Sequence, residues 1–367
     1  MKKKREQIVL FVGAGASRAC GYPLNVEILP EILRRLEEDD FDDEHIEAHA
    51  QELKKALGHL LPPRGSGIPM PEVTEILSII DHCIESGEEL FGTKQCSLKL
   101  ADARWLLDRA VSRVIKCIHK YNRDIKPEAI LEWINRQRRE GADVTIISTN
   151  YDFSLDRVLF DDLNDWSTDY AKTDFGFTWR DPDDGELVHP SANPKLRLYK
   201  LHGSLNWLTC PRCGSTYVNF MRTLVTLADV DDGPWAACHC EYSPLRALLV
   251  APSFVRRYRD RNILSIWRSA AERLRLADRW VMIGYSFPPE DIGLRTLFLR
   301  ANLSSRKLPR VQVVNQEMKA LMRYRQLFPR CEYTGDGIKK FLEGTACWDN
   351  PVVPRRPRRS SQKRAAS

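Results

Sequence analysis

The stretch that decides the fold is "IVLFVGAGASRACG" at residues 8–21, an apolar run that ends in a glycine turn. Its first six residues are apolar without alternation, which is typical of a strand buried on both faces of a parallel sheet. Gly13 and Gly15 flank Ala14 in the turn, and Ser17 follows. Such a turn lets the backbone approach a phosphate closely, and the next helix offers N–H groups to the anion. The stretch therefore predicts a strand, an anion-binding turn and a helix.

This turn departs from the dinucleotide fingerprint G-x-G-x-x-G. Arg18 stands at the position of the third glycine. An arginine there could still pair with a diphosphate. The chain also lacks the ribose-binding acid about 20 residues further on that a hydride-transfer enzyme needs. An ordinary strand-to-helix turn therefore remains the alternative interpretation.

Further apolar runs are spaced along the chain, each bounded by glycine, proline or polar residues and separated by helical patterns. Such alternation predicts an α/β fold, a Rossmann-like doubly wound parallel sheet. About 130 residues separate the first two strands, and nearly all of them are helix-patterned. They predict a helical insertion over the carboxyl edge of the sheet, whose apolar stripes are most simply packing surfaces. The later runs lie at residues 144–148, 198–202, 247–252, 280–284 and 311–315.

These patterns divide the chain as follows. We expect one domain over residues 1–348, with its sheet core at 7–20 and 144–320, the helical insertion at about 24–140, a small zinc module at about 205–245, and a disordered basic tail at 350–367. The insertion is the candidate for contacts between copies of a homo-oligomer.

The net charge of +6 comes from the tail, which has six lysines and arginines after Asp349 and no acid. With its prolines and serines this segment cannot build a core. We therefore expect no nucleic-acid binding, except weakly through the tail. No apolar run approaches the roughly 18 residues that a membrane span needs. The start "MKKKREQ" lacks a convincing cleavage site downstream, so we expect a cytoplasmic protein.

Four of the ten cysteines form two close pairs. Cys210 and Cys213 are C-x-x-C, and Cys238 and Cys240 follow as C-x-C after 24 residues. Two such pairs suit a tetrahedral thiolate zinc site, although His239 could compete as a ligand. Four thiolates leave no open coordination position, so the zinc is predicted to be structural.

Polar side chains follow two of the expected strands. "STNYD" places Asn150 and Asp152 after one strand, and "LYKLHGS" places His202 after another. The carboxyl ends of parallel strands share one edge, where ligands bind. Individually, Asp152 could be a helix N-cap and His202 a satisfied interior histidine. Their joint placement favours a functional site.

The motifs "GAGAS", "STNYD", "LHGS", the paired cysteines, "IGYSF" and "VVNQE" occur in the order found in the sirtuin family, which the chain resembles. The resemblance covers residues 8–20 and 144–320 and implies NAD bound in a Rossmann-like catalytic domain beside a zinc-bearing module. It implies cleavage of the nicotinamide–ribose bond. His202 would be the catalytic base, and Asn150 and Asp152 would hold the nicotinamide-side ribose and the attacking water.

The resemblance also implies residues for the rest of the cofactor. The turn of the first motif would border the diphosphate, and the last two motifs would contact the adenosine half. These positions are Gly13, Ala14, Gly15 and Ser17 for the diphosphate, Gly284 and Ser286 for the adenine-side ribose or phosphate, and Asn315 for the adenosine ribose.

The chain departs from the protein deacylases of that family. Thr149 replaces a glutamine, "GYPLNVE" at 21–27 lacks D-F-R, and "APSF" at 251–254 lacks the acid of the acyl-lysine channel. These changes and the long insertion look like the bacterial sirtuin-like branch that degrades NAD in anti-phage defence. The expected activity is therefore NAD+ hydrolysis, with an activating partner protein as a further expectation. A protein deacylase and a non-catalytic sensor of NAD or ADP-ribose are the alternatives.

The chemistry of hydrolysis suits this residue set. The pyridinium of NAD is already cationic and leaves neutral, so the leaving group needs no general acid, unlike that of an ordinary glycosidase. An imidazole can accept a proton at neutral pH, and an asparagine can orient water. Hydrolysis and cyclisation differ only in the nucleophile and stay undistinguished.

Overall fold

The fold is seen in a computed structural model. It describes residues 5–63, 65–90, 97–116, 124–161, 173–182, 184–191, 193–219, 238–240, 245–250, 260–289, 291–305 and 307–349. The expected disordered tail at 350–367 and the "APSF" segment lie outside these residues.

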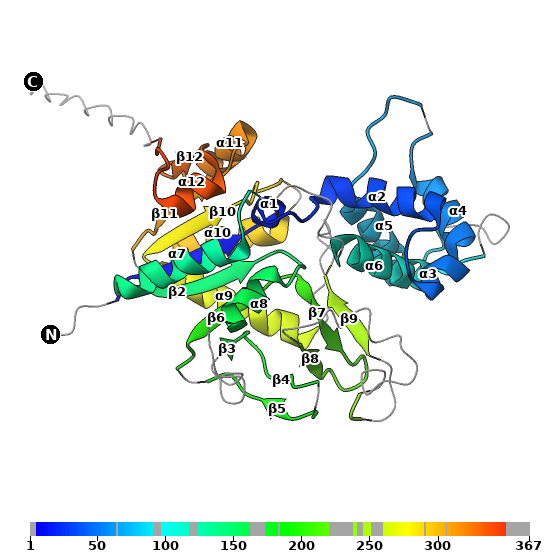
Figure 1. Cartoon of the computed structure of the whole chain (residues 1–367), viewed down its shortest axis with the longest axis horizontal. Coiled ribbons are helices and arrows are strands. Elements are labelled where there is room, and N and C mark those ends of the chain that lie inside the picture. Colours follow the sequence, from blue (N-terminus) through cyan, green and yellow to red (C-terminus); the bar gives the residue numbers. More distant parts are fainter. Residues whose placement is uncertain are drawn as a thin grey trace, which may run out of the picture.

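A seven-stranded parallel sheet forms the centre of the molecule (Figure 1). The central strand β1 is hydrogen-bonded in parallel to β2 on one side and β10 on the other. Five of its six residues are buried, as the continuous apolar run predicts. This confirms the expected α/β fold with a parallel sheet. In spatial order the strands are β12 (Glu332–Thr334), β11 (Arg310–Val314), β10 (Arg279–Ile283), β1 (Gln7–Val12), β2 (Asp143–Ser148), β6 (Leu196–Lys200) and β3 (Thr173–Asp174).

Helices cover both faces of this sheet (Figure 1). On one face α7 packs on β2 and contacts α8 and α12, and on the other α9 packs against α10. The chain leaves β1 toward β2 but later returns to β10 on its other side, so the strand order reverses between β1 and β10. Ligands bind at such a reversal in open α/β sheets. The helices are α1 (Ala14–Ala19), α7 (Pro127–Arg139), α8 (Ser154–Asp161), α9 (Arg261–Leu276), α10 (Ile292–Ser304), α11 (Met318–Leu327) and α12 (Gly337–Glu343).

The helical insertion forms a separate lobe beside the sheet (Figure 1). Helix α6 is its centre, because α2, α3, α4 and α5 all contact it. Two ion pairs that share the buried Asp43 join parts of this lobe. The Asp43 carboxylate lies 2.6 Å from the Arg109 guanidinium and 3.0 Å from that of Arg113. The range of about 24–140 expected for the insertion also includes α7, which belongs with the sheet. The helices of the lobe are α2 (Asn25–Glu38), α3 (Glu44–Ala48), α4 (Ala50–Leu60), α5 (Val73–Ser86) and α6 (Leu100–Lys116).

A second, five-stranded sheet carries the clustered cysteines. The run at 247–252 was expected in the parallel sheet, and this expectation was wrong: β9 pairs antiparallel with β7. A short apolar run shows burial but not which strand it pairs with. Trp179 of β4 and Trp207 of β7 each pack edge-on against the ring of Phe175, which follows β3. The strands are β5 (Leu187–Val188), β4 (Trp179–Arg180), β8 (Thr216–Val218), β7 (Gly203–Thr209) and β9 (Arg246–Leu249).

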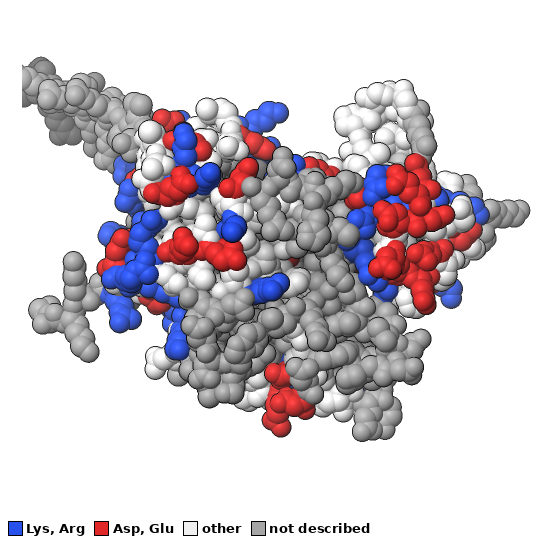
Figure 2. Space-filling view, in the orientation of Figure 1, with Lys and Arg blue, Asp and Glu red and all other residues white. Residues whose placement is uncertain are grey.

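Acidic side chains gather on the visible face of the helical lobe, whereas the face over the main sheet mixes both signs (Figure 2). The exposed acids of the lobe include Glu37, Glu38, Asp39 and Asp40 at the end of α2. Among the described helices, none is both long and apolar enough to span a bilayer.

Candidate functional site

A cavity of about 1090 Å³ lies at the carboxyl edge of the main sheet, between the sheet and the helical lobe. Its volume is at the upper end of the range of roughly 300–1,000 Å³ that small-molecule and cofactor sites occupy. Every candidate from the sequence except Gly13 and the cysteines lines it. They are Ala14, Gly15, Ser17, Arg18, Asn150, Asp152, His202, Gly284, Ser286 and Asn315.

The glycines of the first turn serve packing within the protein. A Cβ on Gly13 would lie 2.6 Å from the Tyr285 Cα, and one on Gly15 would lie 2.8 Å from the Gly284 carbonyl oxygen. Gly284 itself has φ +63°, and its Cβ would lie 2.2 Å from the Ala16 nitrogen. The turn after β1 and the loop after β10 therefore touch backbone to backbone at the point where the strand order reverses.

Backbone hydrogen bonds join the same two segments. The Gly13 amide donates to the Ile283 carbonyl at 3.0 Å, and the Gly15 amide donates to the Gly284 carbonyl at 2.7 Å. The Ala16 amide donates to the Gly13 carbonyl at 2.9 Å. Three amides of the turn already have protein acceptors, so it offers an anion fewer donors than the motif predicts. Arg18 also has a partner, Glu27 of α2 at 3.1 Å.

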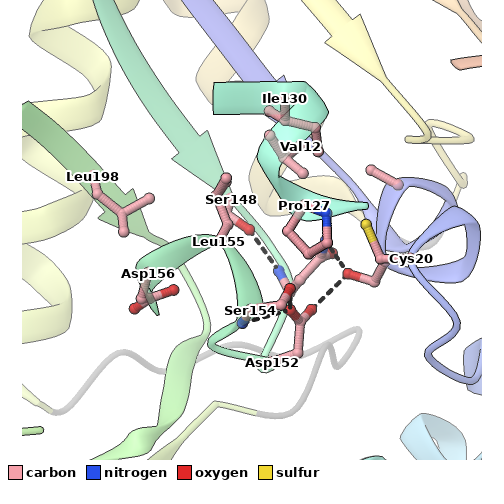
Figure 3. Close-up of a pocket in the computed structure, with 13 residues that line it drawn as sticks. Val12, Cys20, Pro127, Ile130, Ser148, Asp152, Ser154, Leu155, Asp156 and Leu198 are labelled. Carbon is pink, nitrogen blue, oxygen red and sulfur yellow. Dashed lines mark hydrogen bonds between the residues drawn. The ribbon is translucent and has the colours of Figure 1, made fainter. Parts of the chain in front are cut away.

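Asn150, Ser17 and Asp152 form a chain of hydrogen bonds. The Asn150 side-chain amide donates to the Ser17 hydroxyl at 2.7 Å and to the Gly13 carbonyl at 2.9 Å. Ser17 in turn donates to Asp152 Oδ2 at 2.5 Å. The other Asp152 oxygen accepts from the amide and hydroxyl of Ser154, at the start of α8 (Figure 3). Asp152 and Ser17 thus bind each other, and the expected contact of Ser17 with a diphosphate would compete with this bond.

The tautomer of His202 follows from its backbone contact. His202 lies in the turn between β6 and β7, and its side chain is almost fully buried. Nδ1 is 3.2 Å from the Thr149 carbonyl oxygen, which can only accept. Nδ1 therefore carries the proton, and Nε2 has the lone pair. Thr149, where the deacylases have a glutamine, holds the ring through its main chain.

The loop after β10 is braced from below by Asn315. The side-chain NH2 of Asn315 donates to the Tyr285 carbonyl at 3.1 Å, and its side-chain oxygen accepts from the backbone amide of Glu317 at 2.8 Å. Arg323 of α11 also donates to the Ser286 carbonyl at 3.2 Å. Sequence reasoning missed Tyr285 and Glu317, which line the cavity. Their position directly after a buried strand was the signal available for both.

The helical lobe supplies the opposite wall of the cavity. The sequence placed these helices over the carboxyl edge of the sheet and indicated packing for their apolar stripes, but named none of their residues for the site; the first turns of α2 and α5 line the cavity. The Leu24 amide donates to Glu27 at 2.7 Å, so α2 begins where the deacylase pattern would have D-F-R. Only tertiary contacts bring these turns to the sheet edge. The lining residues are Leu24, Asn25, Val26, Ile28, Glu72, Thr74, Glu75 and Ser78.

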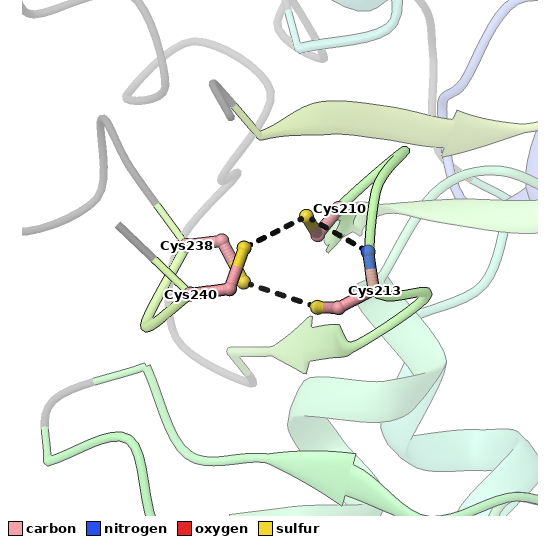
Figure 4. A group of neighbouring side chains, drawn as sticks. All are labelled: Cys210, Cys213, Cys238 and Cys240. Atoms are coloured by element: carbon pink, nitrogen blue, oxygen red, sulfur yellow. Dashed lines mark hydrogen bonds between the residues drawn. The ribbon is translucent and has the colours of Figure 1, made fainter. Parts of the chain in front are cut away.

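The four clustered cysteines meet at one point (Figure 4). Their sulfur atoms all lie within 4.8 Å of one another, with Cys210 to Cys240 at 3.7 Å and Cys213 to Cys238 at 3.4 Å. Zn–S bonds of about 2.3 Å in a tetrahedron separate sulfurs by about 3.8 Å, so the cluster could hold a zinc ion. His239 is not one of these four, but its Nδ1 lies 3.2 Å from the Cys238 sulfur and 3.0 Å from the Tyr217 hydroxyl.

No protein-family model matches the chain, and no curated protein matches its sequence. It is similar to the solved structure of a Sir2 protein with p53 peptide and NAD+, at 13% identity over 92% of this chain and 90% of the other, with a TM-score of 0.43. A structure from work on sirtuin substrate affinity is 13% identical over 92% of both chains, with a TM-score of 0.43. The structure of a Sir2 enzyme is 18% identical over 86% of this chain and 82% of the other, with a TM-score of 0.34. Likenesses this remote carry no argument about activity.

Proposed function

We propose that this protein binds NAD+ in the cavity at the sheet edge and hydrolyses its nicotinamide–ribose bond. The observation that carries the proposal is that Asn150 and His202 line the same cavity, beside the glycine turn that follows β1. They come from different strand ends that are 52 positions apart in the chain (202 − 150 = 52). Polar groups that converge in one large cavity are the usual mark of a ligand site.

His202 is the general base in this proposal. With its proton on Nδ1 and held by the Thr149 carbonyl, the ring presents Nε2 as the acceptor. A neutral imidazole can take the proton of a water or ribose hydroxyl as the bond to nicotinamide breaks. The leaving nicotinamide is neutral and needs no proton from the protein.

Asn150 is the group that orients the nucleophile. Both hydrogens of its amide are used, by Ser17 and Gly13, and its Oδ1 accepts from the Thr149 hydroxyl at 3.5 Å, which leaves Oδ1 a second lone pair. Oδ1 can accept a hydrogen bond from water or from a ribose hydroxyl and so hold it in a fixed direction. Asp152 acts through Ser17. Its carboxylate accepts from the Ser17 hydroxyl and so orients the oxygen that accepts from the Asn150 amide.

The proposal is tested by supplying the full-length protein with NAD+ alone and measuring nicotinamide and ADP-ribose by chromatography. We expect both products in equal amounts. His202→Ala and Asn150→Ala should each lower turnover by about 10²–10⁴-fold, the usual value of a general base or orienting group. His189→Ala is the matched control, since His189 is exposed and does not line the cavity.

Other outcomes identify the alternatives. Products that form only when an acetylated lysine peptide is added would indicate a protein deacylase. Tight binding of NAD+ or ADP-ribose by calorimetry, without turnover, would indicate a sensor. Equal rates for the wild type and His202→Ala would contradict the assignment of the base.

The zinc ion is proposed to be structural. The four cysteines join the β7–β8 turn to the segment before β9, and β7 begins directly after His202. A zinc ion there would brace the sheet from which the His202 turn starts. The role in anti-phage defence, the activating partner, the contacts between copies and the cytoplasmic location stay predictions from the sequence.

A further inference from the structure

Lys200 is a buried cation at the end of β6, two residues before His202. Its side chain is only 1% exposed, as is that of Asp156, which it contacts at 2.9 Å. Its ammonium also donates to the Asp152 carbonyl at 2.6 Å and to the Ser204 hydroxyl at 2.5 Å. An ammonium has three donors, so all of them are satisfied inside the protein.

Two of these acceptors belong to the segments that carry the proposed catalytic groups, and the third, Asp156, lies in α8. The Asp152 carbonyl is in the loop after β2, two residues from Asn150. Ser204 follows His202 and contacts the Tyr151 carbonyl at 3.2 Å. The Lys200 ammonium therefore ties the Asn150 loop to the His202 turn from behind the cavity, of which Lys200 is not a lining residue.

We infer that Lys200 is a positioning residue that, with Asp156, holds Asn150 and His202 in their mutual arrangement. The inference rests on the proposed hydrolysis of NAD+. Stability alone does not explain a buried pair here, because well-packed apolar residues of similar volume are often as stable as a buried ion pair. Each of its contacts instead fixes a backbone or side-chain group next to the site.

The second oxygen of Asp156 takes no part in the contact with Lys200. Asp156 Oδ1 is buried and has no hydrogen-bond partner among the described residues. Asp156 lines a small pocket of about 20 Å³ together with Ser148, Asn150 and Asp152 (Figure 3). A single water molecule fits a polar space of roughly 10–15 Å³ or more. A water molecule in this space could donate a hydrogen bond to Asp156 Oδ1.

Burial raises the pKa of Asp156, and the Lys200 ammonium opposes this shift. Removing one partner alone would therefore leave the other buried without compensation and could unfold the chain. The test uses a double variant, Lys200→Met/Asp156→Asn, which removes both charges and keeps the side-chain volumes close to those of the native pair. The control is Arg109→Met/Asp43→Asn, which neutralises a buried pair of the helical lobe that does not line the cavity and leaves Arg113, the second partner of Asp43, in place.

For Lys200→Met/Asp156→Asn we expect kcat to fall by about 10²-fold, the effect of displacing a catalytic group by about 1 Å. KM for NAD+ should change by less than about threefold, because the cavity walls stay in place. The control pair should alter the melting temperature but neither kinetic constant. Unchanged kcat in a folded double variant would overturn the inference.

Hydrogen–deuterium exchange gives a readout that does not depend on turnover. Amides of residues 149–153 and 201–206 should exchange at least about tenfold faster in the double variant, while those of β1 and β10 should not change. If the wild type does not hydrolyse NAD+ and the double variant still exchanges faster than the wild type, the positioning role holds and the proposed function is refuted. Unchanged exchange in both segments would refute the positioning role itself.

Discussion

The side-chain amide of Asn150 donates a 2.7 Å hydrogen bond to the hydroxyl of Ser17, 133 positions earlier in the chain. The Ser17 hydroxyl donates in turn to Asp152, so a chain of hydrogen bonds joins α1 to the loop after β2. The serine of the glycine motif therefore serves the proposed catalytic residues directly.

Ser17→Ala should lower NAD+ turnover by about 10- to 100-fold, because the Asn150 amide loses the acceptor that orients it. It should also lower the free energy of unfolding by roughly 1–3 kcal/mol, since Asp152 loses a buried donor. Steady-state kinetics and urea unfolding measure the two effects. Ser78→Ala, on the opposite wall of the cavity, is the control and should leave turnover within about threefold. Equal losses in both variants would contradict the assignment.

Gly284→Ala should destabilise the chain by more than the roughly 1 kcal/mol expected from a positive φ alone. The added Cβ would meet the Ala16 nitrogen at 2.2 Å, so the turn after β1 must move. Gly344→Ala separates the two causes, because Gly344 has φ +78° with open space around it. Thermal unfolding of both variants gives the comparison, and equal shifts would show that the backbone contact is not tight.

The cysteine cluster should bind one zinc ion per chain, measured by elemental analysis of the purified protein. Cys213→Ser should abolish stoichiometric binding and lower the melting temperature, because the four ligands close the loop between β8 and β9. Cys347→Ser is the control, since Cys347 is exposed and outside the cluster. Full zinc content in Cys213→Ser would exclude this site.

Acid should weaken the helical lobe through Asp43. Burial raises the pKa of Asp43, but its hydrogen bonds with Arg109, Ile46 and Arg113 outweigh this, and the net pKa is lowered. A lowered carboxyl pKa contributes stability above its unfolded value near 3.9, and this is lost as the pH falls through the folded pKa.

Asp43→Asn should therefore be less stable than the wild type at pH 7, by roughly 3–5 kcal/mol for a broken buried pair. The difference should shrink below about pH 4. Urea unfolding at several pH values measures it. A difference that stays constant from pH 7 to pH 3 would show that the charge of Asp43 contributes nothing.

The sequence by itself determined which segments are buried strands and which polar groups follow them. An unbroken apolar run ending in a glycine turn is a buried parallel strand, and the polar groups after such strands share one edge whatever the details of packing. For this reason Asn150, Asp152 and His202 could be expected in one cavity, and the paired cysteines could be expected to converge, before any coordinates were known.

Only the tertiary structure decided what each group contacts. The bonds of Ser17 to Asn150 and Asp152, the pairing of β9, the wall supplied by α2 and α5, and the contacts of Lys200 all join residues far apart in the chain. The spacing of apolar residues along the chain indicates which positions are buried, because one face of each helix or strand is buried. It does not record the partner, because hydrogen bonds act over about 3 Å and depend on how the elements are placed in space.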